Sequence, residues 1–207
     1  VLDPCRRLEG EGFALTVLGV DAAGRLDPQA VADAITDETI LVSIMAANNE
    51  TGTLQPMAEI GRITRDRGVL LHCDATQAAG KLPVDVEAMG ADLLSLSAHK
   101  IYGPKGVGAL YLRRRSPRVR LACQIDGGGH QRGLRSGTLN VPGIVGLGAA
   151  AELCAADMAA EAARLTTLRD RLHDALAGEL EGVHLNGHPT ERLANTVNLS
   201  FAHVQGE

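Results

Sequence analysis

Aromatic side chains are scarce in this sequence of 207 residues, which contains two Tyr, two Phe and no Trp. Aliphatic and alanine side chains must therefore dominate the interior, and an apolar content of 45% is enough to build a buried core. A chain of this length fits one large domain or two small ones.

The sequence also lacks an excess of basic residues, a membrane-spanning run and a signal peptide. With 20 Lys and Arg against 25 Asp and Glu, the net charge is −5 and does not indicate nucleic-acid binding. No apolar run approaches the length of a membrane span, so we expect no membrane insertion. The chain begins at Val1 rather than Met, which we interpret as a fragment whose targeting information can lie elsewhere.

Closely spaced cysteines are missing as well. Four cysteines are spread over the chain, at positions 5, 73, 123 and 154. None forms a CxxC pair, so we expect reduced thiols in a cytoplasmic protein. His72, Cys73 and Asp74 are adjacent residues of types that can bind metals. Successive strand residues point to opposite faces, however, so these three side chains cannot converge on one ion. We therefore expect no metal site.

Apolar segments of strand length alternate with helical segments along the first half of the chain. One helix is expected to begin at Asp27 and Pro28, a cap followed by proline, and another covers residues 56–67. This alternation implies right-handed crossovers and a mainly parallel sheet. The expected strands cover residues 13–18, 39–45, 69–74, 93–96 and 107–112. An alanine-rich helix over residues 142–180 and a strand over residues 195–201 follow.

The segment LLSLSAHKIYGPKGVG, residues 93–108, carries the main candidate functional residues of the sequence. An apolar strand leads directly into Ser97, His99 and Lys100, at the strand end where ligands bind in open α/β sheets. Burial lowers the pKa of a lysine, which frees its neutral amine to form an imine. A surface lysine after an ordinary strand is the alternative, and for a single lysine it is the commoner case.

A second strand, residues 69–74, ends in the carboxylate of Asp74. A pyridoxal phosphate site needs a lysine to hold the aldehyde and a carboxylate to keep the pyridine nitrogen protonated. Asp74 and Lys100 would meet these two needs, although any α/β protein offers an Asp and a Lys after strands.

Four blocks of the sequence resemble the NifS/IscS cysteine desulfurases, which are pyridoxal phosphate enzymes of fold type I. In chain order they read NNETGTLQP, HCDATQAAGKLPVDV, SLSAHKIYGPKGVGALYLRR and GGGHQRGLRSGTLNVPGIVG. The resemblance runs from Val1 to Glu207 with short gaps, and family members extend beyond both ends. It implies an α/β large cofactor-binding domain of fold type I over residues 1–158, without its N-terminal part. Residues 159–207 would begin a small α+β domain.

The resemblance also implies roles for individual residues. Lys100 would bind the cofactor covalently, and Asp74 would pair with its ring nitrogen. Gln77 would hydrogen-bond its ring oxygen, while Ser97 and His99 would bind its phosphate. Without the resemblance, Gln77 is a helix-start side chain facing water, and Ser97 and His99 are ordinary exposed groups.

Two further site residues come from the resemblance. Asn49 would lie beside the cofactor's phenolic oxygen and the substrate carboxylate, although a polar loop after a strand is also an ordinary turn. Thr138 would reach across a homodimer to the other subunit's phosphate.

The activity implied by the resemblance converts L-cysteine to L-alanine and leaves sulfur on the enzyme as a persulfide. The sulfur would pass to an acceptor or an iron–sulfur scaffold protein. The resemblance places the sulfur-accepting cysteine beyond Glu207, so we expect residues 1–207 to be inactive alone. The alternatives are a related lyase or aminotransferase, such as selenocysteine lyase, and a non-catalytic scaffold that dimerises or docks to partners.

The arginines of residues 113–120 form a charge run after the last strand of the sheet. Such a run is usually a solvated strand end, and this interpretation is favoured over a docking patch for an acidic partner.

Overall fold

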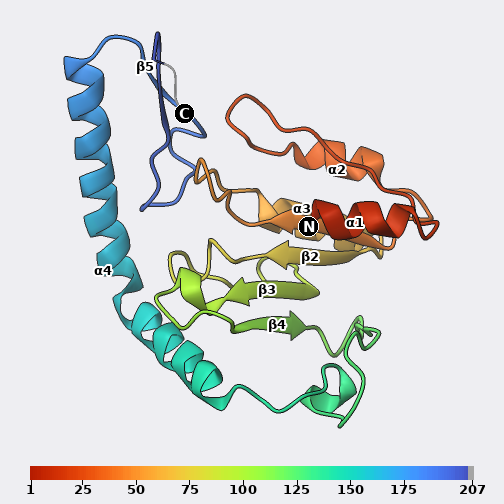
Figure 1. Cartoon of the computed structure of the whole chain (residues 1–207). Helices are drawn as coiled ribbons and strands as arrows, with labels where there is room; N and C mark the ends of the chain where they lie inside the picture. The colour runs from red at the N-terminus through yellow and green to blue at the C-terminus, as the bar shows by residue number, and fades with distance from the viewer. Residues whose placement is uncertain (205–207) are drawn as a thin grey trace.

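The computed structural model describes residues 1–204, and its centre is a four-stranded sheet (Figure 1). The strand order is β1-β2-β3-β4, with β1 (Leu41–Met45), β2 (Leu70–Asp74), β3 (Leu93–Ser97) and β4 (Gly108–Leu112). The first three strands are parallel and β4 pairs antiparallel with β3, which confirms the mainly parallel sheet.

Helices connect and flank these strands. In chain order they are α1 (Leu2–Glu9), α2 (Pro28–Ala34), α3 (Met57–Asp66), the 3-10 turns η1 (Ala98–Lys100) and η2 (Gln131–Gly133), and α4 (Val141–Glu179). The expected cap of α2 is present, because the Asp27 carboxylate accepts a hydrogen bond of 2.8 Å from the Gln29 amide. The remaining strands, β5 (Val183–Leu185) and β6 (Leu199–Phe201), form a separate antiparallel pair.

The core lies on one face of the sheet. Leu71 and Cys73 of β2 are fully buried there with Ile60 of α3, and Val31 of α2 joins the same apolar cluster. Aliphatic residues and alanines make up nearly all of this cluster, as the lack of aromatics requires.

The other face of the sheet carries a polar row across three strands. His72 stands at its centre on β2, with its Nδ1 2.8 Å from the Ser43 hydroxyl of β1. Its Nε2 lies 3.2 Å from the Ser95 hydroxyl of β3. Because alternate strand residues face opposite sides, this face also presents Asp74.

Two expected strands differ from the structure. Residues 13–18 form no strand, since within residues 1–204 no neighbouring strand pairs with this segment and completes its backbone hydrogen bonds. Alternating apolar residues are not sufficient without such a partner. The strand expected over residues 195–201 is shorter, being only β6, and its partner β5 was not predicted from the sequence.

The long helix α4 confirms the helix expected over residues 142–180, and it runs from below the sheet up one side of the molecule (Figure 1). Its N-terminus is capped by Asn140, whose side-chain oxygen accepts from the Gly143 amide at 3.1 Å. By length and composition α4 would be able to cross a membrane, so the expectation that no apolar run reaches that length is wrong for this helix. Its alanines and branched aliphatic residues raise its mean hydropathy, and core helices of other proteins meet the same criterion.

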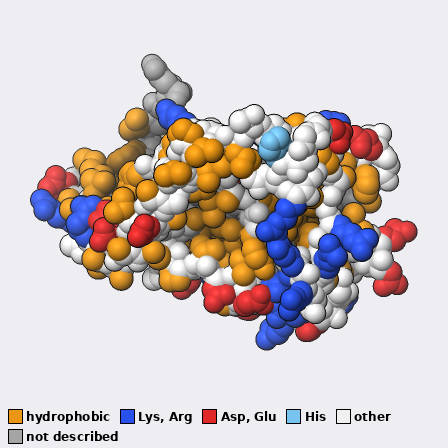
Figure 2. Space-filling model, turned by 90° about the horizontal axis from the view of Figure 1, so that it is seen from below, with side chains coloured by type: hydrophobic (Ala, Val, Ile, Leu, Met, Phe, Trp, Pro, Cys, Tyr) orange, Lys and Arg blue, Asp and Glu red, His pale blue; other side chains and the backbone are white. Residues whose placement is uncertain are grey.

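The underside of the molecule is strongly apolar (Figure 2). Exposed apolar side chains on β4 and the first half of α4 are Leu110, Val141, Ile144, Val145 and Leu153. The predicted domain boundary after residue 158 falls inside α4, and the division into two domains stays a prediction.

Candidate active site

Three parallel strands end at the same edge of the sheet. In the register, Met45 of β1 is opposite Asp74 of β2, and Asp74 is opposite Ser95 of β3. Backbone pairing continues past the strand ends, because the amide of Ala46 donates to the Asp74 carbonyl at 2.9 Å and the amide of Ala75 to the Ser95 carbonyl at 2.9 Å. The segments that follow β1, β2 and β3 therefore meet at one edge, as the sequence predicted.

Asp74 is the last residue of β2 and is half-buried. Its Oδ1 accepts a hydrogen bond of 3.0 Å from the Thr76 amide, which fixes the carboxylate at the strand end. Among residues 1–204, Oδ2 accepts no hydrogen bond, so this oxygen can take a donor from a ligand.

Gln77 is half-buried in the helical turn after β2. Its side-chain oxygen and its backbone carbonyl both accept from the Lys81 amine, at 3.0 Å and 3.1 Å. Sequence reasoning missed Lys81. The signal was its position four residues after Gln77, which places the two side chains on the same side of a helical turn.

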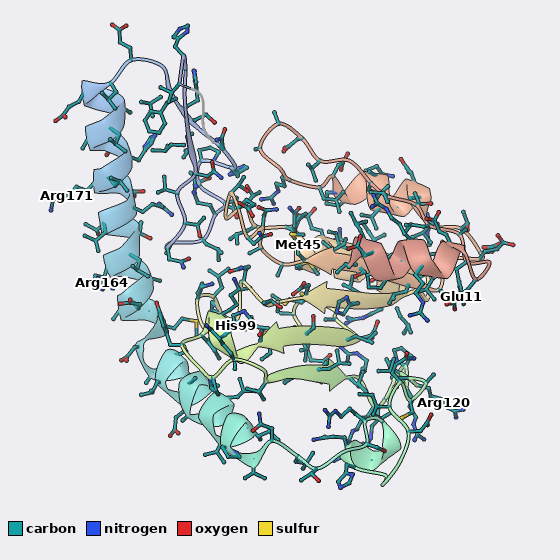
Figure 3. The ribbon with its side chains drawn as sticks, viewed as in Figure 1. Glu11, Met45, His99, Arg120, Arg164 and Arg171 are labelled. Atoms are coloured by element: carbon teal, nitrogen blue, oxygen red, sulfur yellow. The ribbon has the colours of Figure 1, made fainter. Side chains whose placement is uncertain are left out.

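Ser97, His99 and Lys100 lie together at the end of β3, where Figure 3 labels His99. The Ser97 hydroxyl lies 2.8 Å from His99 Nδ1. Between them Ala98 points inward and is fully buried, while its carbonyl accepts from the amides of Ile101 at 3.0 Å and Gly103 at 2.9 Å. This tight 3-10 turn holds the residues next to Ala98 at the surface.

Lys100 is exposed, which corrects the expectation of a buried amine. Turning Ala98 into the core leaves the side chains of His99 and Lys100 on the outer side of η1. Lys100 borders a hollow between η1 and α4, whose lining also includes Lys81, Tyr102 and Cys154. Burial lowers the pKa of Lys81, and the nearby charge of Lys100 lowers it further.

Asn49 lies in the loop after β1 and is exposed. Its amide donates to the Glu50 carboxylate at 2.7 Å. The loop itself is organised by Asn48, whose side-chain oxygen accepts from the amides of Glu50 at 2.8 Å and Thr51 at 2.9 Å. The structure thus places Asn49 after the correct strand end but in contact with Glu50.

Thr138 is not brought to these residues. It is exposed in the segment between η2 and α4, which runs below β4 in Figure 1 and away from the ends of β2 and β3. The resemblance assigns Thr138 to the other subunit's phosphate, a role that does not require contact with its own chain's Lys100. That role stays a prediction.

Cys73 takes no part in this site. It is fully buried on the core face of β2, opposite to His72 and Asp74. Burial raises the pKa of its thiol to about 12, and the neighbouring Asp74 carboxylate acts in the same direction. The three adjacent side chains therefore diverge, as strand geometry predicted.

The basic run after β4 is only partly the solvated strand end that the sequence indicated. Arg114, Arg115, Arg118 and Arg120 are exposed, but Arg113 is buried. Arg113 directly follows β4, and its side chain contacts Glu87 and Asp92 in the segment before β3, whereas the later arginines lie beyond the sheet. Its amide also donates to the Asp92 carbonyl at 2.8 Å.

The edge as a whole presents a carboxylate, an amide, a primary amine and a hydroxyl–imidazole pair within the ends of two adjacent strands. This set can bind an anionic group through Ser97 and His99, pair with a protonated nitrogen through Asp74 and attack a carbonyl through Lys100.

Comparisons with known protein families and with curated proteins point to the same group of proteins. The aminotransferase class-V family matches residues 1–207. The curated protein named cysteine desulfurase IscS from Anaeromyxobacter dehalogenans (strain 2CP-C) is 58% identical over 207 residues, covering 100% of this chain and 51% of that protein. The protein of the same name from Histophilus somni (strain 2336) is 52% identical over the same length. The chain thus spans about half the length of the curated relatives it matches.

Solved structures agree with the sequence matches. A NifS-like protein superposes with a TM-score of 0.91 at 39% identity, covering 99% of this chain and 55% of that one. A structure described as SspA in complex with cysteine superposes with a TM-score of 0.82 at 38% identity, covering 97% of this chain and 55% of that one. These matches confirm the resemblance to NifS/IscS proteins and the expected fold.

Proposed function

Because the chain belongs to the aminotransferase class-V family, we propose that it is the central part of a pyridoxal-phosphate-dependent cysteine desulfurase. Its substrate would be L-cysteine and its product L-alanine, with the sulfur carried to an acceptor or an iron–sulfur scaffold protein. We propose a cytoplasmic homodimer as the working form.

One observation carries the proposal: the ends of β2 and β3 deliver an acid and an amine to the same edge. Asp74 closes β2, Lys100 follows β3, and the parallel register joins the two strands over residues 72–74. The donor set fits the cofactor, since Ser97 and His99 suit its phosphate, Gln77 suits its ring oxygen and Asp74 suits its ring nitrogen. The relatives named cysteine desulfurase support the choice of reaction within the family.

Each site residue of this chain would have a separate role in the reaction, set by the chemistry of its side chain. When bound, the cofactor supplies an electron sink for the substrate's α-carbon. Asp74 would keep the ring nitrogen protonated, with its free Oδ2 as the acceptor. Lys100 would hold the cofactor covalently and then move a proton with its released amine. Asn49, once freed from Glu50, would orient the substrate carboxylate.

Sulfur transfer needs a reactive, accessible thiolate, and none of the four cysteines of this chain is fully exposed, since Cys5, Cys123 and Cys154 are half-buried and Cys73 is buried. Cys73 is buried with a raised thiol pKa. Cys154 is half-buried against η1, where its thiol lies 3.9 Å from the Ile101 carbonyl. We therefore propose that the persulfide forms on a cysteine outside these residues and that residues 1–207 have no desulfurase turnover alone.

The decisive experiment is borohydride reduction of the complete protein after incubation with pyridoxal phosphate, followed by peptide mapping. We expect a visible absorbance band that reduction removes, with the phosphopyridoxyl group on Lys100 and none in Lys100→Ala. Lys105→Ala is the matched control, since Lys105 is an exposed lysine in the loop that follows. A label on Lys81 or Lys105 instead would contradict the assignment.

The same protein discriminates between the alternatives. A non-catalytic scaffold need not bind cofactor and would show no absorbance band. A selenocysteine lyase would bind cofactor but release selenium from selenocysteine without releasing sulfide from cysteine. Sulfide release from cysteine at a rate that depends on Lys100 supports the desulfurase.

A further inference from the structure

Lys81 makes two contacts to one residue of the candidate site. Its amine donates to the Gln77 backbone carbonyl at 3.1 Å and to the Gln77 side-chain oxygen at 3.0 Å. The two residues are one turn apart in the helical segment after β2, where the Lys81 amide donates to the Ala78 carbonyl at 3.0 Å. Lys81 is half-buried, so its position is set by packing as well as by these bonds.

The second contact has a chemical consequence. A glutamine amide has an acceptor end and a donor end, and an ammonium group is a donor only. The contact with Lys81 therefore requires the oxygen of Gln77 to face Lys81, which turns the NH₂ group of Gln77 away from it. A lysine that merely capped the turn would need the backbone carbonyl alone.

We propose that Lys81 is a positioning residue that fixes the amide orientation of Gln77, so that Gln77 presents N–H donors to an anionic ring oxygen of the bound cofactor. This inference rests on the proposed function, because the ring oxygen belongs to pyridoxal phosphate. In the opposite orientation Gln77 would present its own oxygen to an oxygen anion, which is repulsive.

The surroundings of Lys81 agree with a role inside the site. Lys81 and Lys100 line the same hollow, together with Gly80, Tyr102, Glu161 and Asn195. Lys81 therefore contacts Gln77 and also lines the hollow that the amine proposed to hold the cofactor borders.

The test uses the complete protein with three single variants: Lys81→Met, Lys81→Arg and, as matched control, Lys105→Met. Thermal unfolding first establishes that each variant is folded. The measured quantities are the dissociation constant for pyridoxal phosphate and the wavelength of the visible absorbance band. A methionine keeps the length of the side chain but removes the donor, whereas arginine is again a donor-only cation.

We expect Lys81→Met to weaken cofactor binding roughly tenfold, the scale of one lost hydrogen bond, and to shift the absorbance band. Lys81→Arg should restore both quantities, and Lys105→Met should leave both at their wild-type values. A residue with a purely structural role would change the unfolding temperature without moving the band.

A double-mutant cycle shows whether Lys81 acts through Gln77. In a Gln77→Ala background, Lys81→Met should cause no further loss of affinity and no further shift of the band. Additive effects, or a wild-type band and affinity in Lys81→Met, would overturn the inference while borohydride labelling of Lys100 left the proposed function intact. Failure of the wild-type protein to bind cofactor would instead overturn the proposed function, and the inference with it.

Discussion

Arg113 and Asp92 form a buried ion pair, in which Arg113 Nε lies 2.9 Å from Asp92 Oδ1 and each side chain is 10% exposed. The other oxygen of Asp92 accepts from the Leu71 amide of β2 at 2.9 Å. Arg113 also donates to the Glu87 carboxylate at 2.7 Å and to the Ala91 carbonyl at 3.0 Å. The pair thus ties the end of β4 to the start of β3 and to β2, at the sheet edge opposite to the candidate site.

Arg113→Ala should strongly destabilise the fold, because it leaves the Asp92 carboxylate buried without its partner. We expect the free energy of unfolding to fall by about 3–5 kcal/mol, measured by urea denaturation. Arg114→Ala, which removes an exposed arginine next in the chain, should change it by less than about 0.5 kcal/mol. Equal effects of the two substitutions would show that the pair does not form.

Asp74→Asn in the complete protein should retain the cofactor but lose most of the turnover. Asparagine preserves the shape of the side chain and removes the charge that holds the ring nitrogen's proton. Sulfide release should fall by roughly 10²–10³ or more, the scale of a lost electrostatic contact in the transition state. The control is Asp66→Asn, an exposed carboxylate at the end of α3. Near-normal turnover in Asp74→Asn would mean that the carboxylate does not face the cofactor.

The thiol of Cys73 should resist modification in the folded protein. With a pKa of about 12, only about one thiol in 10⁴ is ionised at pH 8, and its burial also excludes reagents. Titration with a thiol-specific disulfide reagent should leave Cys73 unmodified until urea is added. Cys73→Ser should remove this late-reacting thiol and leave the sulfide release of the complete enzyme largely intact. Rapid labelling of Cys73 without urea would refute its burial.

His72 should make stability depend on pH. Burial lowers the pKa of His72 below its ordinary value of 6.5, although Asp74 opposes the change. The folded state therefore binds fewer protons than the unfolded chain between the two pKa values. Its stability is full above pH 6.5 and is lost as the pH falls from there through the lower folded value.

Urea denaturation at pH 5 and at pH 7.5 tests this dependence. We expect the difference in unfolding free energy between the two pH values to shrink in His72→Gln, whose amide does not titrate and can still reach the serines beside it. His184→Gln, at an exposed histidine of β5, should preserve the difference. An unchanged difference in His72→Gln would assign the pH dependence to other groups.

The sequence alone determined most of the strand–helix alternation and predicted the candidate site residues. Asp74 and Lys100 were predicted because a polar residue after a short apolar segment marks a strand end, and parallel strands end at one edge. The four sequence blocks then specified the family, which the comparisons confirmed. These signals are local in the chain, and local signals can be read without coordinates.

Only the tertiary structure decided which charged groups are buried and which side chains meet. Arg113 was grouped with exposed arginines, because its pairing with Asp92 joins segments about 20 residues apart. The exposure of Lys100 followed from the inward turn of Ala98, and residues 13–18 formed no strand because no strand within residues 1–204 pairs with them. Burial and pairing depend on what another part of the chain brings into contact, and that is settled by packing rather than by sequence pattern.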